Sequence, residues 1–221
     1  MMGHALRGEF DHVAFYARFL GRKRSFDWYH DLFISRKACR GEITPQYALL
    51  SDDMIARIVS RWPDLKVIYS VRNPVDRAWS ACRYQATRSG RDAVGEAQAM
   101  EFLDAQPQNY HGKYLENTER WTRHLKPGHM LILFYDALGS QADAAYQDVC
   151  DFLDIPVAPI SGDHRVNASI QQDIPETFLS RAQEIFAQDI KDLDAAWGGY
   201  CTDWAGGDLV SRHVRPASFR L

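Results

Sequence analysis

A six-residue apolar run, Lys66-Val-Ile-Tyr-Ser-Val71, constrains the fold of this chain more than any other segment. Runs of this β-branched kind are typical of a strand that is buried on both faces of a parallel sheet. The residues before it, 51–62, have apolar side chains at helical spacing. After it, Arg72-Asn73 ends the strand and Pro74 suits the first turn of a new helix. The segment therefore predicts a helix, a strand and a second helix in succession.

The same order of patterns recurs further along the chain. Residues 114–125 have a helical apolar face, Lys126-Pro127-Gly128 ends it, and residues 130–135 form a second apolar run. Helical spacing returns at 142–153 and again at 178–197, where apolar residues advance by three or four. Helices and strands that alternate in this way predict an α/β domain with a central parallel sheet.

Length and composition favour one globular domain over residues 1–221. Hydrophobic residues make up 46% of the chain and charged residues 25%, which excludes a disordered or low-complexity protein. The sequence has no internal repeat and no long linker. It also has no apolar run long enough to span a bilayer, and its first ten residues do not have the pattern of a signal peptide.

The cysteines, histidines and charges narrow the function further. The four cysteines lie far apart, which favours a reducing, cytoplasmic setting, and neither they nor the eight histidines have metal-ligand spacing. A net charge of −3 gives no reason to expect nucleic-acid binding. The first hundred residues nevertheless carry a net +5 and the remainder −8. The basic part could attract an anionic ligand, or it could simply be a solvated surface.

The end of the first predicted strand is a candidate anion site. Ligands of parallel sheets bind beyond the carboxyl ends of the strands, and the guanidinium of Arg72 leaves the strand there. The helix that Pro74 begins turns its positive end to the same place, and Ser80 follows six residues later. The competing interpretation is that Arg72 and Arg77 pair with nearby acids such as Asp76 while Ser80 merely packs. General physics leaves both interpretations open.

The segment Arg72-Asn-Pro-x-x-Arg77-x-x-Ser80 resembles the 3′-phosphate-binding motif of sulfotransferases that use 3′-phosphoadenosine 5′-phosphosulfate (PAPS). Other segments resemble family motifs in the same order and at similar spacing, over residues 12–200. They are Asp27-Trp28-Tyr29 with Phe33, Gly41 to Tyr47, Gly112-Lys113-Tyr114, Glu119-Arg120-Trp121, Phe134 to Leu138 and Val166 to Ser169. The resemblance is to bacterial and heparan-type members, and it implies a three-layer domain like that of P-loop NTPases.

The resemblance implies roles for several residues. Arg72 and Ser80 would hold the 3′-phosphate of PAPS, and Tyr114 would lie near the cofactor, although an aromatic residue on a helix is also typical of a core. Arg77 belongs to the motif, but we expect a structural ion pair for it.

Sulfuryl transfer needs a base for the acceptor proton. His12 falls where heparan-type relatives place a glutamate base, and a histidine suits general-base work. Asp11 and Glu9 are alternatives, and Glu42, with Thr44, is expected in the catalytic cleft. Sulfuryl transfer implies no obligatory metal.

The sequence departs from the family at three places. Ile43 replaces a lysine, and the segment Gln171-Gln172-Asp173 has no counterpart of the basic loop of heparan-type members. Both differences disfavour heparan sulfate as the acceptor. In addition, no segment resembles the Pro-Lys-x-Gly-Thr-Thr loop that cradles the 5′-phosphosulfate, so the first βα unit, about 30–40 residues judged from the size of such a unit, is expected to be missing.

Two functions follow from this comparison. The first is a PAPS-dependent sulfotransferase, of which this chain would be an N-terminally truncated product. Its acceptor would be a hydroxyl or amine of a carbohydrate or small metabolite. The second is a short, non-catalytic member that binds adenosine 3′,5′-bisphosphate or a protein partner. A P-loop kinase or NTPase is disfavoured, because the chain has no Walker A loop. The sequence predicts neither the acceptor nor the oligomeric state.

Overall fold

The computed structural model describes residues 26–31, 39–105, 111–159, 170–211 and 213–221. The chain divides into two compact units, one formed by residues 1–67 and 116–130 and the other by 68–115 and 131–221. None of the helices in the described ranges is both long and apolar enough to cross a membrane.

Helices α2, η1, α3 and most of α7 belong to the first unit. They span Phe26–Asp31, Pro45–Leu49 (a 3-10 helix), Asp52–Arg61 and Tyr114–Thr122. The hydroxyl of Ser51 accepts the N–H of Met54 at 3.3 Å and so caps α3, in agreement with the predicted helix. The Trp121 indole donates to the Tyr47 carbonyl at 3.0 Å, which fixes α7 against η1.

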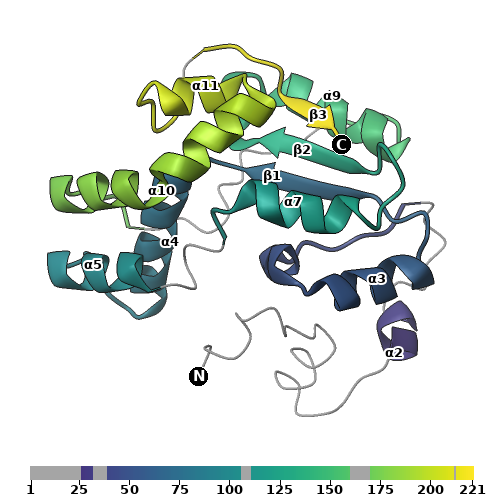
Figure 1. Ribbon diagram of the computed structural model, residues 1–221, viewed down its shortest axis with the longest axis horizontal. Coiled ribbons are helices and arrows are strands. Elements are labelled where there is room, and N and C mark those ends of the chain that lie inside the picture. The colour runs from purple at the N-terminus through teal and green to yellow at the C-terminus, as the bar shows by residue number, and fades with distance from the viewer. Residues whose placement is uncertain (1–25, 32–38, 106–110, 160–169, 212) are drawn as a thin grey trace. The chain divides into compact units, whose positions relative to one another are not determined.

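Strands β1 (Val67–Val71), β2 (Met130–Phe134) and β3 (Ser218–Arg220) form one sheet in the order β1-β2-β3. Strands β1 and β2 are parallel (Figure 1). Strand β3 is antiparallel to β2, with Ile132 opposite Phe219. Every residue of β2 is buried, as predicted for a central strand.

The burial of β1 differs from the prediction. Val71 is buried, but Ile68 and Ser70 are exposed, so side chains alternate between a covered and an open face. The predicted burial on both faces is therefore wrong for β1. The reason is its position, because β2 has a strand on each side whereas β1 is an outer strand of the described sheet.

The second unit also contains the remaining helices. These are α4 (Pro74–Arg88), α5 (Glu96–Asp104), α8 (Tyr135–Ser140), α9 (Ala142–Leu153), α10 (Glu176–Trp197) and α11 (Tyr200–Ala205).

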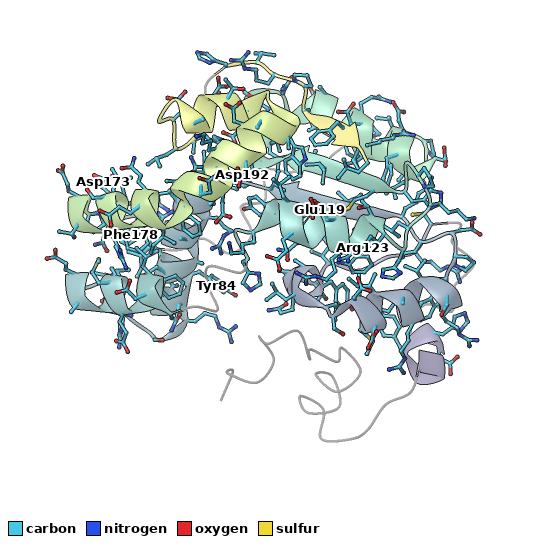
Figure 2. All side chains as sticks on the ribbon, viewed as in Figure 1. Tyr84, Glu119, Arg123, Asp173, Phe178 and Asp192 are labelled. Carbon is cyan, nitrogen blue, oxygen red and sulfur yellow. The ribbon has the colours of Figure 1, made fainter. Side chains whose placement is uncertain are left out.

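Helix α10 organises the core of this unit by packing against α4, α5 and α11. Its buried residues Phe178, Ala182, Phe186, Ile190 and Leu193 form the apolar stripe that the sequence predicted. Phe178, labelled in Figure 2, lies with its ring 5.1 Å from that of Trp79 on α4. The aromatic pair joins the two helices on either side of this part of the core.

Candidate functional site

Asn73 shapes the backbone at the end of β1. Its side-chain oxygen accepts the N–H of Val75 at 2.9 Å, which caps α4 directly after the strand. Its side-chain nitrogen donates to the carbonyl of Asp208 at 2.8 Å. The asparagine therefore ends β1, begins α4 and ties the segment after α11 to this point.

The guanidinium of Arg72 is held on two sides. Its Nε donates to the carboxylate of Asp76, one turn into α4, and its Cζ atom lies 4.4 Å from the ring centroid of Tyr135, which directly follows β2. Its terminal Nη groups make no hydrogen bond to any residue that the structure describes. The ion pair with Asp76 that competed with the anion site is thus present, but it uses only one edge of the guanidinium.

Tyr114 supports the backbone of Arg72. Its buried hydroxyl donates to the Arg72 carbonyl at 2.8 Å and accepts the Arg72 N–H at 3.3 Å. Its ring meets that of Tyr69 edge-on, with centroids 5.7 Å apart. The hydroxyl is engaged by the protein itself, so Tyr114 acts on the candidate site through Arg72.

Arg77 lies close enough to both Arg72 and His111 to interact with their charges. Burial lowers the pKa of Arg77, while the neighbouring Tyr114 and Tyr69 favour its charge. Burial, together with the charge of Arg77, lowers the pKa of His111 to about 4, so this imidazole is neutral near pH 7. Arg77 therefore adds positive potential next to Arg72.

Ser80 lies on the same face of α4 as Asp76, one turn further on, because residues four apart are neighbours on a helix. It is half-buried, and its hydroxyl makes no hydrogen bond to the described residues. Asp76 and Ser80 therefore lie along one side of α4.

The segment after α11 crosses the ends of both strands. In addition to the contact with Asn73, the N–H of Ser211 donates to the buried carboxylate of Asp136 at 2.6 Å, and the Trp204 indole donates to the same oxygen at 3.3 Å. Burial raises the pKa of Asp136, although these donors oppose the shift. Asp136 thus fixes the segment at the end of β2, as Asn73 does at the end of β1.

Asp203 anchors the same segment. Its carboxylate, 5% exposed, accepts from Arg215 Nη2 at 2.7 Å, Ser211 Oγ at 2.6 Å and His213 Nδ1 at 3.2 Å. The hydrogen bonds from Arg215, joined by those from Ser211 and His213, hold the pKa of Asp203 well below its usual range against the effect of burial. The carboxylate therefore stays ionised.

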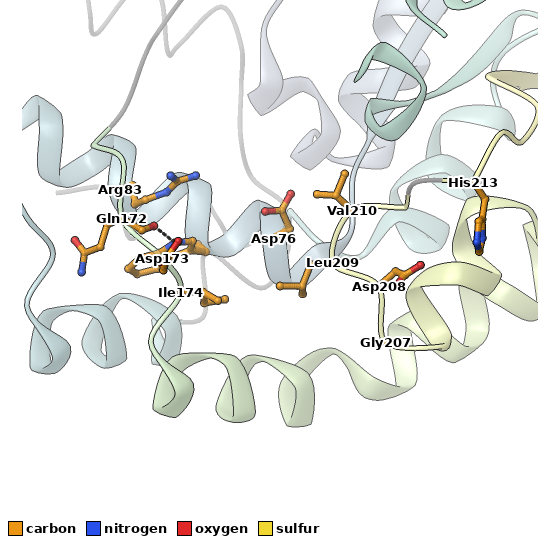
Figure 3. A pocket seen from close by; sticks show the side chains of 11 residues that line it. Asp76, Arg83, Gln172, Asp173, Ile174, Gly207, Asp208, Leu209, Val210 and His213 are labelled. Atoms are coloured by element: carbon orange, nitrogen blue, oxygen red, sulfur yellow. Dashed lines mark hydrogen bonds between the residues drawn. The ribbon is translucent and has the colours of Figure 1, made fainter. Parts of the chain in front are cut away.

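An open pocket of about 860 Å³ borders this region (Figure 3). Its lining comes from α4, from the segment before α10 and from the segment after α11. The residues are Asp76, Trp79, Arg83, Gln172, Asp173, Ile174, Gly207, Asp208, Leu209, Val210 and His213. The carboxylate that binds Arg72 thus also lines the pocket.

Gln172, which forms part of the pocket wall, is held in place by hydrogen bonds to other segments. Its carbonyl accepts the Trp79 indole N–H at 3.1 Å, and its side-chain amide exchanges hydrogen bonds of 2.8 and 3.1 Å with the backbone of Val94. These contacts fix Gln172 between α4 and the segment before α5.

The other predicted residues lie elsewhere. Glu42 is an exposed residue of the first unit, where it accepts hydrogen bonds from the hydroxyls of Tyr47 and Thr44. His12, Asp11 and Glu9 lie outside the described residues, as does the segment from Val166 to Ser169. The described geometry thus brings together Arg72, Ser80 and Tyr114 in one unit, and Glu42 belongs to the other.

Several residues of the site were not selected from the sequence. Tyr135 directly follows β2 as Arg72 follows β1, and the ends of parallel strands meet at one edge, so its position was a usable signal. Asp203, His213 and Arg215 belong to no recognisable motif. No pattern around His111 indicated its burial next to Arg77.

The sheet, the turn after β1 and helix α4 belong to an α/β fold. A sequence model of the sulfotransferase domain matches residues 8–191, and the chain belongs to the sulfotransferase family. The family's reaction is sulfuryl transfer, and membership classes the chain as a transferase. No curated protein sequence gives a significant match.

Two solved sulfotransferase structures are similar to this chain. A sulfotransferase from Alicyclobacillus acidocaldarius is 19% identical, with a TM-score of 0.55 over 81% of this chain and 74% of that one. The sulfotransferase domain from the curacin biosynthetic pathway is 18% identical, with a TM-score of 0.40 over 65% of this chain and 60% of that one. At such identity, the first of these likenesses establishes the fold alone.

Proposed function

We propose that the chain is a sulfotransferase that uses PAPS as donor and a hydroxyl or amine of a carbohydrate or small metabolite as acceptor. The observation that carries the proposal is the state of Arg72, whose terminal Nη edge has no partner among the described residues while Nε is fixed by Asp76. A guanidinium edge of this kind matches two phosphate oxygens.

The described residues fit the 3′-phosphate of this donor. Arg72 and the Ser80 hydroxyl would hold the phosphate from one side of α4, and the buried charge of Arg77 would add attraction. Tyr114 would contribute by fixing the backbone of Arg72. The 3′-phosphate distinguishes PAPS from ATP, so these residues would act as a selectivity element. When bound, the donor supplies an activated sulfuryl group.

The acceptor must lose a proton during the reaction. We assign this proton to His12, because histidine is the side chain whose ordinary pKa best suits general-base work near pH 7, and we keep Glu42 as a further candidate residue of the catalytic cleft. We also propose a single domain over residues 1–221, with a core of about 12–200, because the family match covers residues of both compact units. The carboxylates in the pocket wall favour a neutral or amine-bearing acceptor over heparan sulfate.

We also propose a cytoplasmic location and no nucleic-acid partner. The location is supported by the cysteines, all four of which are free in the described residues. A second candidate function is the binding of adenosine 3′,5′-bisphosphate without transfer, which the Nη edge of Arg72 would equally support.

Calorimetric titration with adenosine 3′,5′-bisphosphate tests the anion site. Arg72→Ala should weaken binding about tenfold to a hundredfold, equivalent to about 1.5–3 kcal/mol for a charge-assisted contact. Arg88→Ala, an exposed arginine on the same helix, is the matched control and should leave the affinity unchanged. Equal affinities of Arg72→Ala and the unsubstituted protein would refute the assignment.

A second assay separates transfer from binding alone. The conversion of PAPS to adenosine 3′,5′-bisphosphate is followed with 4-nitrophenol or glucosamine as acceptor. Acceptor-dependent turnover supports the enzyme. Tight nucleotide binding without turnover favours the binding protein.

A further inference from the structure

Two neighbouring side chains contact the guanidinium of Arg72 at different positions. Asp76 binds Nε from the first turn of α4, and the Cζ atom of Arg72 lies over the ring of Tyr135, 4.4 Å from the ring centroid. The side chain of Arg72 is 20% exposed, and that of Asp76 is 13% exposed. Tyr135 is 44% exposed. The guanidinium is therefore oriented by its neighbours even though its outer edge is open.

This arrangement selects how an anion can approach. A guanidinium has a side edge that includes Nε and an end edge formed by the two Nη groups, and each edge can bind two oxygens. Asp76 occupies the side edge, and its negative charge repels a second anion there. Tyr135 lies against the guanidinium through a cation–π contact. The end edge, which has no hydrogen-bond partner among the described residues, remains for a bidentate contact.

We propose that Asp76 and Tyr135 are positioning residues, which hold Arg72 so that its Nη edge receives a terminal phosphate monoester of a nucleotide. The inference rests on the proposed function, because it takes Arg72 as the ligand of the 3′-phosphate. It adds that selectivity for this phosphate depends on an acid and an aromatic ring that do not touch the phosphate themselves. A flexible arginine would have to lose its rotamer freedom on binding, whereas this one has already lost it.

A merely structural ion pair leads to a different expectation. If Asp76 and Tyr135 only stabilised the fold, their loss would lower the melting temperature and weaken all nucleotides alike. If they position Arg72, their loss reduces the preference for a nucleotide with a 3′-phosphate over one without it. The ratio of two affinities is therefore the informative readout.

The experiment compares adenosine 3′,5′-bisphosphate with adenosine 5′-monophosphate by calorimetry. Asp76→Ala and Tyr135→Leu should each reduce the preference for the bisphosphate about fivefold to tenfold. Asp76→Asn keeps an oxygen that accepts from Nε, and Tyr135→Phe keeps the ring, so both should retain the preference within about threefold. Tyr84→Leu is the matched control, because Tyr84 is 40% exposed, lies about two turns along α4 from Asp76, and pairs with Arg88, whose Cζ is 5.9 Å from its ring centroid.

A double-mutant cycle completes the test. In an Arg72→Ala background, the same two substitutions should change the preference less than about twofold, because the residue that they position is gone. Thermal melting confirms that each variant is folded.

Failure of the proposed anion site and failure of the positioning inference give different results. If the unsubstituted protein does not prefer the bisphosphate, both the proposed anion site and this inference are overturned. If it does prefer the bisphosphate, but Asp76→Ala and Tyr135→Leu keep the full preference, the inference fails and the proposed function stands.

Discussion

The carboxylate of Asp203 is predicted to hold the segment after α11 in place, and Asp203→Asn is the substitution that tests this. The variant keeps the shape of the side chain but removes its charge. The carboxylate accepts from both Nε and Nη2 of Arg215, at 3.2 and 2.7 Å, and from the hydroxyl of Ser211 at 2.6 Å. An amide can accept through one oxygen only, and its NH₂ group would face donors.

The expected loss follows from these contacts. A hydrogen bond to a charged group contributes about 1.5–3 kcal/mol, but the bonds of one network are not additive. The side chain of Arg215 is 38% exposed and regains water when its partner is lost, which lowers the cost. We expect the free energy of unfolding to fall by about 2 kcal/mol at pH 7, or the melting temperature by about 4–8 °C for a chain of this size.

The pH dependence gives the sharper test. Because the pKa of Asp203 is lowered in the folded protein, its contribution to stability is complete above the unfolded value of about 4 and is lost as the pH falls below it. The difference between the two proteins should thus be constant from pH 7 to pH 5 and smaller at pH 3. Asp192→Asn is the control, since Asp192 on α10 is an exposed residue (Figure 2) whose loss should cost under about 0.5 kcal/mol. A variant as stable as the unsubstituted protein at pH 7, or a difference that grows towards pH 3, would refute the reasoning.

Two other substitutions test the interior of the second unit. In Asp136→Asn the pH dependence should have the opposite sign, because burial raises the pKa of this carboxyl and its ionisation therefore opposes folding. As the pH rises from 4 to 7, the melting temperature of the variant should increase relative to that of the unsubstituted protein. A relative decrease over that range would contradict the assignment. Phe178→Ala removes a fully buried ring that packs on Trp79. Chemical denaturation should therefore show that the free energy of unfolding falls by about 3–5 kcal/mol. A fall below about 1 kcal/mol would show that this contact is not part of the core.

Much of the fold was predictable because its signals are local. The helices α3, α4, α9 and α10 and the strand β2 follow from apolar spacing and from Ser51, Asn73 and Pro74 at helix starts. The open face of β1 was not predictable, because the apolar run is the same whether a strand lies inside or outside the sheet. Strand β3 has only three residues, and its pairing with β2 joins positions almost ninety residues apart. No local pattern reports such a pairing.

The residues of the candidate site likewise fall into those that a local motif predicts and those that only the folded sheet brings together. Arg72 and Ser80 stand in one motif on a single strand, turn and helix, so the sequence alone brings them together. The contact of Arg72 with Tyr135 joins the ends of two strands, and it depends on the sheet. From the sequence, Asp76 is only a residue that competes with an anion for Arg72. The structure supports a different interpretation, since Asp76 takes one edge of the guanidinium and leaves another edge open.

The contacts of Arg72 and those of the segment after α11 can be separated by experiment. Asp76 and Tyr135 reach Arg72 from α4 and from the end of β2, and neither contact uses a residue beyond 191, where the family match ends. Asn73, Asp136 and Asp203 instead bind residues 208–215. Loss of the Asp203 charge should therefore lower the melting temperature while the preference for a 3′-phosphate persists. Loss of the Tyr135 ring should reduce the preference with a smaller effect on melting. If both variants changed both quantities in parallel, the two sets of contacts would form one cooperative structure, and the phosphate selectivity would depend on the C-terminal segment as well.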